Sequence, residues 1–366
     1  MPVAADLFVF LVAAAVSLSA SYLVVTRLER IGEWLGLSEG LLGVLAALAG
    51  DGPEITAAVA ALATHQHQVG AGVVIGSNVF NLAALLGLGA VVAGAIALHR
   101  KVILLGGAVG VWVAVACLVT VLGVIPPAAG LAAVLAALIP YLIVLGASGA
   151  RLARLRLPRR WRDWLAAAVS EEEAELIEVI HPPHGRGKDV ALAVAALVVV
   201  VVASVAMERS ATMLGTHFGI PDIIVGGVIL AAVTSLPDSV AAVYLAARGR
   251  GAAMLSTTLN SNALNVTAGL LLPATITGLG PASGQSDLIA VWYLALTLIA
   301  LAFAYRDSGM SRASGALIIG AYLVFLGSLL TVAHSAEPGL GATIVPLVIV
   351  VACSGAGLAR RRRRLR

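Results

Sequence analysis

Two carboxylates lie in the middle of long apolar stretches, and each directly follows a proline. They are Glu54 and Asp238. A cluster of small hydroxyl and amide residues follows each one at the same distance. An offset of 184 residues separates Glu54 from Asp238 and also Ser77 from Ser261. The segments 50–81 and 234–265 are therefore predicted to be two copies of one internal repeat.

Both copies carry the oxygen ligands that hard cations prefer. Such ligands suit Ca²⁺, Na⁺ or Mg²⁺ better than softer metals. Ionisable residues in apolar spans point to a functional site, and no Lys or Arg inside the same helices neutralises the acids. Interhelical hydrogen bonding is the alternative role for any single Ser, Thr or Asn. The candidate ligands are Asp51, Glu54, Ser77, Asn78, Asn81, Thr234, Ser235, Asp238, Ser261, Asn262 and Asn265.

The composition indicates an all-α integral membrane protein. Of 366 residues, 60% are hydrophobic and 11% are charged, against about 25% charged in soluble domains. The mean hydropathy is +1.02. The net charge of +4 comes from Arg residues between apolar runs, which indicates membrane topology and no nucleic-acid partner. The lipid bilayer is the expected surroundings, and no cofactor or enzyme motif is found.

Apolar runs of about 20 residues predict eleven transmembrane helices. Basic residues follow every odd-numbered run, whereas the other connections contain almost none. This alternation places the N-terminus outside and the C-terminus in the cytoplasm. The predicted helices are 5–26, 38–63, 69–97, 102–123, 127–150, 189–208, 222–247, 252–279, 286–304, 312–333 and 342–359.

The two copies lie five helices apart, so they cross the membrane in opposite senses. We therefore predict two inverted five-helix repeats, 1–150 and 189–333, an architecture that supports alternating access. A cytoplasmic loop, 151–188, joins them and is expected to hold a short amphipathic helix capped by Ser170. The segment 334–366 adds one transmembrane helix and a basic tail.

The motifs resemble those of the calcium/cation antiporter superfamily, which includes sodium/calcium and proton/calcium exchangers. Pro53-Glu54 with 76–81 (Gly-Ser-Asn-Val-Phe-Asn) matches the first repeat, and 234–238 (Thr-Ser-Leu-Pro-Asp) with Ser261-Asn262 matches the second. The resemblance implies a secondary antiporter in the plasma membrane, functional as a monomer. Glu54 and Asp238 would bind the divalent cation, and nearby Ser, Thr and Asn residues would serve the exchanged ions.

The sequence departs from the family pattern at several positions. Thr-Ser before the first Pro-Glu is replaced by Gly50-Asp51, which removes two hydroxyls and adds a carboxylate. Asn260 replaces a Gly, and Val73 and Thr257 each replace an Asn. We expect exchange of Ca²⁺ for Na⁺ or H⁺, and family frequency favours Na⁺. Antiport of another divalent cation and a cation channel remain alternatives, and counterflow would distinguish an exchanger from a channel.

Overall fold

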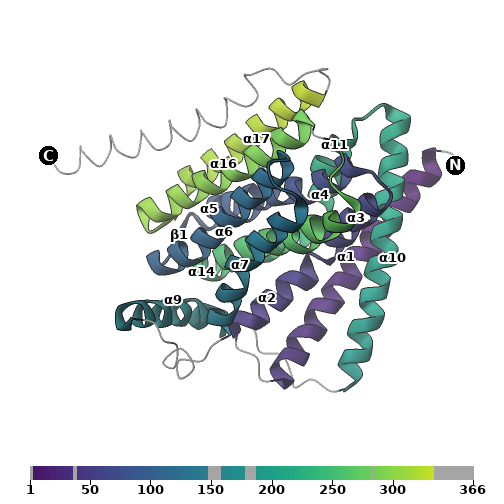
Figure 1. The fold of residues 1–366 in the computed structure, drawn as a ribbon. Helices are drawn as coiled ribbons and strands as arrows, with labels where there is room; N and C mark the ends of the chain where they lie inside the picture. The colour runs from purple at the N-terminus through teal and green to yellow at the C-terminus, as the bar shows by residue number, and fades with distance from the viewer. Residues whose placement is uncertain (1–2, 36–38, 147–157, 178–186, 282, 334–366) are drawn as a thin grey trace.

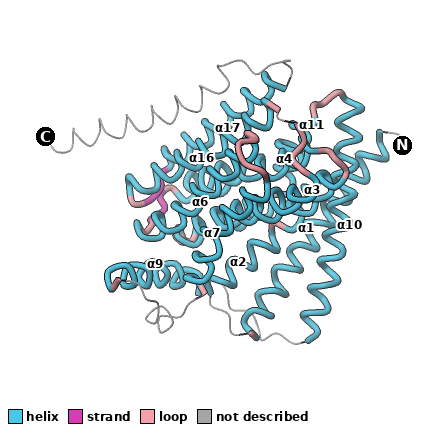
Figure 2. Tube along the Cα trace, in the orientation of Figure 1, coloured by secondary structure: helices cyan, strands magenta, loops and turns pink. Residues whose placement is uncertain are grey.

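The computed structural model describes residues 3–35, 39–146, 158–177, 187–281 and 283–333, and this part of the chain is almost entirely helical (Figures 1 and 2). In chain order, with η marking π-helices, its helices are α1 (Val3–Trp34), α2 (Glu39–Gly50), α3 (Gly52–Ala63), α4 (His67–Asn81), η1 (Leu82–Leu88), α5 (Gly89–Ala93), α6 (Arg100–Val121), α7 (Pro127–Leu145), α9 (Arg159–Ile177), α10 (Gly187–Phe218), α11 (Asp222–Ile224), η2 (Val225–Leu230), α12 (Ala231–Thr234), α13 (Leu236–Ala247), α14 (Gly251–Leu264), η3 (Asn265–Leu271), α15 (Leu272–Thr277), α16 (Gly284–Asp307) and α17 (Arg312–Ala333). Two short strands, β1 (Ala95–Ala97) and β2 (Gly309–Ser311), pair antiparallel with Ile96 opposite Met310.

The described helices are long and apolar enough for a multi-pass membrane protein. Seven of them have the length and composition of a membrane span. The helices Asp222–Thr234 and Leu236–Ala247, which are bent by 49° relative to each other, would form an eighth if they are counted as one span. Helical segments occupy the first ten of the eleven predicted stretches. The eleventh, 342–359, lies outside the described residues. The count of eleven and the inverted repeat therefore stay predictions.

The two predicted helices that carry the acids are each broken in two. The breaks fall at Asp51 and Ser235, two residues before Pro53 and Pro237. Proline has no backbone N–H to donate, so the helical hydrogen-bond ladder is interrupted there. The predicted helices 38–63 and 222–247 are thus each interrupted just before their proline. Each acid lies in the first turn of a new half-helix, where the positive end of the helix dipole favours a carboxylate.

The helices after the acids each contain a π-helical segment. Asn81 is followed by η1, and Asn265 begins η3. Such segments are rare and are often found at functional sites. The predicted helices 69–97 and 252–279 are thus interrupted just beyond the Ser-Asn motif of each copy.

The loop 151–188 contains a longer helix than expected. Helix α9 begins at Arg159, directly after Pro158, so Ser170 lies inside the helix and does not cap its start. Proline fixes a φ angle suited to a helix start, which explains the earlier beginning. Helix α9 packs against α2, α6, α7 and α14.

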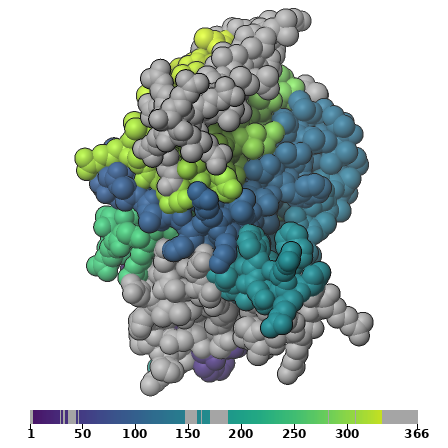
Figure 3. Space-filling view, turned by 90° about the vertical axis from the view of Figure 1, so that its left-hand side faces the viewer, coloured from purple at the N-terminus to yellow at the C-terminus, as the bar shows by residue number. Residues whose placement is uncertain are grey.

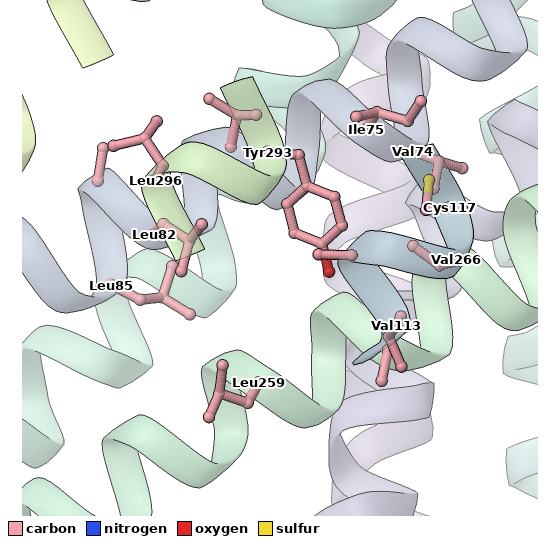
Figure 4. Packing of buried hydrophobic residues seen from close by; sticks show 14 of the residues in the cluster. Val74, Ile75, Leu82, Leu85, Val113, Cys117, Leu259, Val266, Tyr293 and Leu296 are labelled. Atoms are coloured by element: carbon pink, nitrogen blue, oxygen red, sulfur yellow. The ribbon is translucent and has the colours of Figure 1, made fainter. Parts of the chain in front are cut away.

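Two long helices, α1 and α10, pack along each other beside the core (Figure 1). Arg27 pairs with Asp189 at 2.8 Å, and Ser17 shares a hydrogen bond of 2.7 Å with Ser204. The main hydrophobic core lies among α4, α6, α14 and α16, where Tyr293 is surrounded by apolar side chains (Figure 4). This packing fixes the helices that carry the candidate site.

Candidate cation-binding site

Glu54 is completely buried and is held by residues of the other repeat copy. Its Oε1 accepts a hydrogen bond from the Ser235 hydroxyl, and its Oε2 accepts one from Asn265 Nδ2 at 2.5 Å. Thr234 also interacts with this carboxylate. Hydrogen bonds to a charged acceptor are the stronger ones in proteins. The first acid is therefore positioned by donors of the second copy, from the helix break at Ser235 and from Asn265 at the start of η3.

Asp51 lies at the equivalent break in the first copy. Its Oδ1 accepts a hydrogen bond from Ser261 Oγ at 2.7 Å, whereas its buried Oδ2 has no hydrogen-bond partner. Asp51 interacts electrostatically with Asp238 and Glu54. A Cβ atom at Gly50 would lie 2.9 Å from Asp238 Oδ1, so the absence of a side chain there lets Asp238 approach the backbone.

The amide side chains join the two copies at the centre. Asn78 Nδ2 donates to the carbonyl oxygen of Asn262 at 3.0 Å, and Asn262 Nδ2 donates to that of Asn78 at 3.2 Å. Asn81 Nδ2 contacts Ser261 Oγ at 3.3 Å and Asn262 Oδ1 at 3.2 Å. The side-chain oxygens of Asn81 and Asn265 are buried without a hydrogen-bond partner.

Eight of the eleven candidate ligands form one continuous hydrogen-bonded chain across the two copies. Its order is Asp51, Ser261, Asn81, Asn262, Asn78, Asn265, Glu54 and Ser235. Asp238 adjoins the chain through Asp51. Ser77 and Thr234 instead donate to carbonyl oxygens of their own helices, at 2.6 Å and 2.9 Å.

The donor set fits a hard cation better than it fits a preformed transition-metal site. Three buried oxygens lack a donor, namely Asp51 Oδ2, Asn81 Oδ1 and Asn265 Oδ1, and buried acceptors of this kind need a partner. In the described ranges, no three His, Cys, Asp or Glu side chains group closely enough to hold a metal ion by themselves. Amide and hydroxyl oxygens must therefore complete the coordination of any cation bound here.

Sequence reasoning missed one residue beside the cluster. Tyr293 of α16 is buried, and its hydroxyl interacts with Asn78. It lies outside both repeat copies, so repeat spacing gave no signal for it. Asn260, noted only as a departure from the family pattern, donates to Ser256 Oγ at 3.2 Å within its own helix.

Burial around the cluster differs between its two ends. Asp238, Gly50 and Thr257 are partly exposed. Asp238 and Thr257 lie on α13 and α14, which the loop 248–250 joins, and Gly50 ends α2, which packs against α14. The residues at the equivalent positions, offset by 184, are Glu54, Thr234 and Val73, and these are buried. The site is thus better sealed on the side of the loop 64–66, which is the predicted outer side.

Four glycines form the seal on that side, where α4 packs against η2. We call Gly72, Gly76, Gly226 and Gly227 the glycine seam. A Cβ atom at Gly76 would lie 2.4 Å from the Gly227 carbonyl oxygen, and one at Gly226 would lie 2.3 Å from the Val69 carbonyl oxygen. The two backbones touch without side chains between them, as is common where membrane helices approach closely.

The chain resembles curated proteins that are named sodium/potassium/calcium exchangers. The chain is 34% identical to sodium/potassium/calcium exchanger 2 of Gallus gallus over 124 residues, which cover 32% of this chain and 19% of that protein. It is 32% identical to the same exchanger of Homo sapiens, with the same coverage. The chain thus matches only about a fifth of the length of these relatives.

Solved structures share the fold over most of the chain. The crystal structure of the H⁺/Ca²⁺ exchanger CAX matches with a TM-score of 0.72 and 16% identity, covering 98% of this chain and 88% of that one. A structure of the sodium-calcium exchanger NCX_Mj matches with a TM-score of 0.55 and 19% identity, covering 89% and 99%.

A family comparison covers both halves of the chain. The sequence model described as "Sodium/calcium exchanger protein" matches residues 6–149 and again residues 188–331. Each match contains one of the two Pro-acid motifs and the Ser-Asn motif that follows it. The chain therefore belongs to the sodium/calcium exchanger family, within the calcium/cation antiporters.

Proposed function

We propose that the protein is a secondary active antiporter that exchanges Ca²⁺ for Na⁺ or H⁺ by alternating access around the buried cluster. One observation carries this proposal. Glu54 of the first copy is held by Ser235 and Asn265 of the second, beside acceptor oxygens that lack donors. Ligands drawn from both copies make the strength of cation binding depend on how the two copies are arranged.

The charge of the cluster supports a divalent cation together with a monovalent one. Asp51, Glu54 and Asp238 supply three carboxylates, and no Lys or Arg in the described ranges forms an ion pair with them. A Ca²⁺ ion offsets two negative charges, and Na⁺ or H⁺ offsets the third. The matched proteins include exchangers named for sodium and one named for H⁺, so the proposal covers both coupling ions.

Alternating access is supported by the unequal burial of the two ends. The glycine seam closes α4 onto η2 at one end, whereas Asp238 is partly exposed at the other. The conformation described here is accordingly the one in which ions enter and leave beside Asp238. In the proposed orientation, with the N-terminus outside the plasma membrane, this is the cytoplasmic side. We further propose a functional monomer with repeats 1–150 and 189–333 and an added span in 334–366.

The test is ⁴⁵Ca²⁺ uptake into proteoliposomes under an outward Na⁺ gradient and, separately, an outward H⁺ gradient. We expect one gradient to drive uptake and Glu54→Gln and Asp238→Asn each to abolish it. Glu208→Gln is the matched control, because Glu208 is a buried acid of α10 outside the cluster. If Glu208→Gln abolishes uptake as completely, charge loss in any helix suffices and the site assignment is wrong.

The same vesicles distinguish two alternative functions, antiport of another divalent cation and a cation channel. Uptake of Mg²⁺ or Mn²⁺ in place of Ca²⁺ would assign another divalent cation to the site. Counterflow distinguishes a channel, because internal unlabelled Ca²⁺ accelerates ⁴⁵Ca²⁺ entry through an exchanger and does not do so through a channel. Folded protein that shows no uptake under either gradient would remove the calcium assignment.

A further inference from the structure

 An apolar groove lies outside the candidate cation site, between α6 and the start of α9. The groove has a volume of about 780 Å³. Its walls are Leu104, Leu105, Ala108 and Val109 of α6 and Arg160, Trp161, Trp164 and Leu165 of α9. The space-filling view shows α9 in teal next to the blue surface of the preceding helices (Figure 3).

The groove combines an apolar wall with aromatic and basic residues at one edge. Leu104 is 46% exposed and Trp161 is 61% exposed. The rings of Trp161 and Trp164 meet edge to face, with centroids 6.3 Å apart. Tryptophan is enriched at the boundary between the bilayer core and the headgroups. The start of α9 is therefore suited to the headgroup level of a membrane.

Arg160 supplies a positive charge at the same edge. Its side chain is exposed, and in the described ranges no acidic residue forms an ion pair with it. Basic residues next to a membrane span attract the anionic lipids of the cytoplasmic leaflet. The charge of Arg160 would favour anionic over neutral lipids, whereas the apolar wall of α6 suits the acyl chain of either kind.

We propose that this groove binds an anionic phospholipid, with an acyl chain along α6 and its phosphate paired with Arg160. The apolar wall, the two tryptophans and the Arg160 guanidinium match the three parts of such a lipid: chain, interface and charged headgroup. The proposal does not depend on transport activity. It concerns the surface of α6 and α9 and not the cation cluster.

The test is quenching of tryptophan fluorescence by lipids with brominated acyl chains. One variant keeps Trp161 and the fully buried Trp292, with the other three tryptophans replaced by Phe. A matched control keeps Trp112 and Trp292, because Trp112 is 51% exposed on the same helix α6 but does not line the groove. Each protein is titrated with brominated phosphatidylglycerol or brominated phosphatidylcholine at equal mole fractions.

We expect half-maximal quenching of Trp161 at about fivefold less anionic than neutral lipid, the ratio that corresponds to about 1 kcal/mol for one basic residue. Trp112 should show no preference. Arg160→Ala should remove the preference at Trp161, and Arg160→Lys should keep most of it. Equal quenching by both lipids, a preference that survives Arg160→Ala, or the same preference at Trp112 would each overturn the proposal. Absence of quenching at Trp161 would mean that protein fills the groove, and it would overturn the proposal as well.

Discussion

Replacing Gly76 with alanine tests whether the glycine seam is the closing contact of the transport cycle. The new Cβ atom would lie 2.4 Å from the Gly227 carbonyl oxygen and 2.5 Å from its Cα atom. Both atoms belong to backbone, so no side-chain rotation relieves the overlap. Helix α4 and η2 must therefore move apart for the alanine to be accommodated.

The expected size of the effect follows from this overlap. Inserting a methyl group into a well-packed contact costs about 1–3 kcal/mol. If the cost falls only on the conformation in which the seam is closed, the ratio of open to closed protein rises about 5- to 150-fold. Exchange should slow, because each cycle needs the closed state.

Thiol labelling of a cysteine placed at Val73 measures the opening directly. Val73 is fully buried on α4, on the seam side of the cluster. In a background without Cys117 and Cys353, a membrane-impermeant thiol reagent added on the predicted outer side should modify Val73→Cys slowly. Adding Gly76→Ala should raise the rate by the same 5- to 150-fold.

Gly327→Ala is the matched control. Gly327 lies in another predicted membrane helix, α17, and a Cβ atom there meets nothing within 4 Å. This variant should leave both labelling and exchange unchanged. Unchanged labelling of Val73→Cys in folded Gly76→Ala protein would refute the seam as the closing contact.

Three further outcomes are expected. Asp51→Ser removes one negative charge from the cluster and should lower by one the number of positive charges exchanged for each Ca²⁺. The membrane potential at which net Ca²⁺ flux reverses measures this number. Asn265→Ala should raise the Ca²⁺ concentration for half-maximal uptake about 10- to 100-fold, because Glu54 loses a hydrogen bond worth about 1.5–3 kcal/mol. Gly130→Ala should lower thermal stability by about 1–3 kcal/mol, since its Cβ atom would lie 2.1 Å from Thr120 Oγ1, and adding Thr120→Ala should restore most of it.

The repeated motif could be predicted from the sequence because its spacing is unbroken. Carboxylates, hydroxyls and amides in apolar runs are costly, so their recurrence at an offset of 184 singled out the candidate ligands. Hydropathy likewise located the first ten helical stretches. The exact break points were not predicted, because proline marks the neighbourhood of a break without fixing which residue leaves the helix.

Contacts between distant helices could not be predicted. The spacing of the motifs does not indicate that Ser235 donates a hydrogen bond to Glu54, or that Ser77 donates one within its own helix. Tyr293 was missed for the same reason, since it reaches Asn78 from α16, which lies outside the segments 50–81 and 234–265. The early start of α9 depended on Pro158, whereas the capping pattern at Ser170 was a coincidence of residue types.

The two breaks are equivalent in position but not in chemistry, and this difference decides the charge of the cluster. At one break Ser235 donates its hydroxyl to Glu54. At the other, Asp51 occupies the equivalent place beside Asp238 and has an oxygen without a donor. A neutral donor in one copy is thus matched by a carboxylate in the other. A hydroxyl hydrogen and a bound cation can both satisfy a neighbouring carboxylate. In the proposed mechanism, a cation or proton at Asp51 would therefore do for Asp238 what the Ser235 hydroxyl does for Glu54.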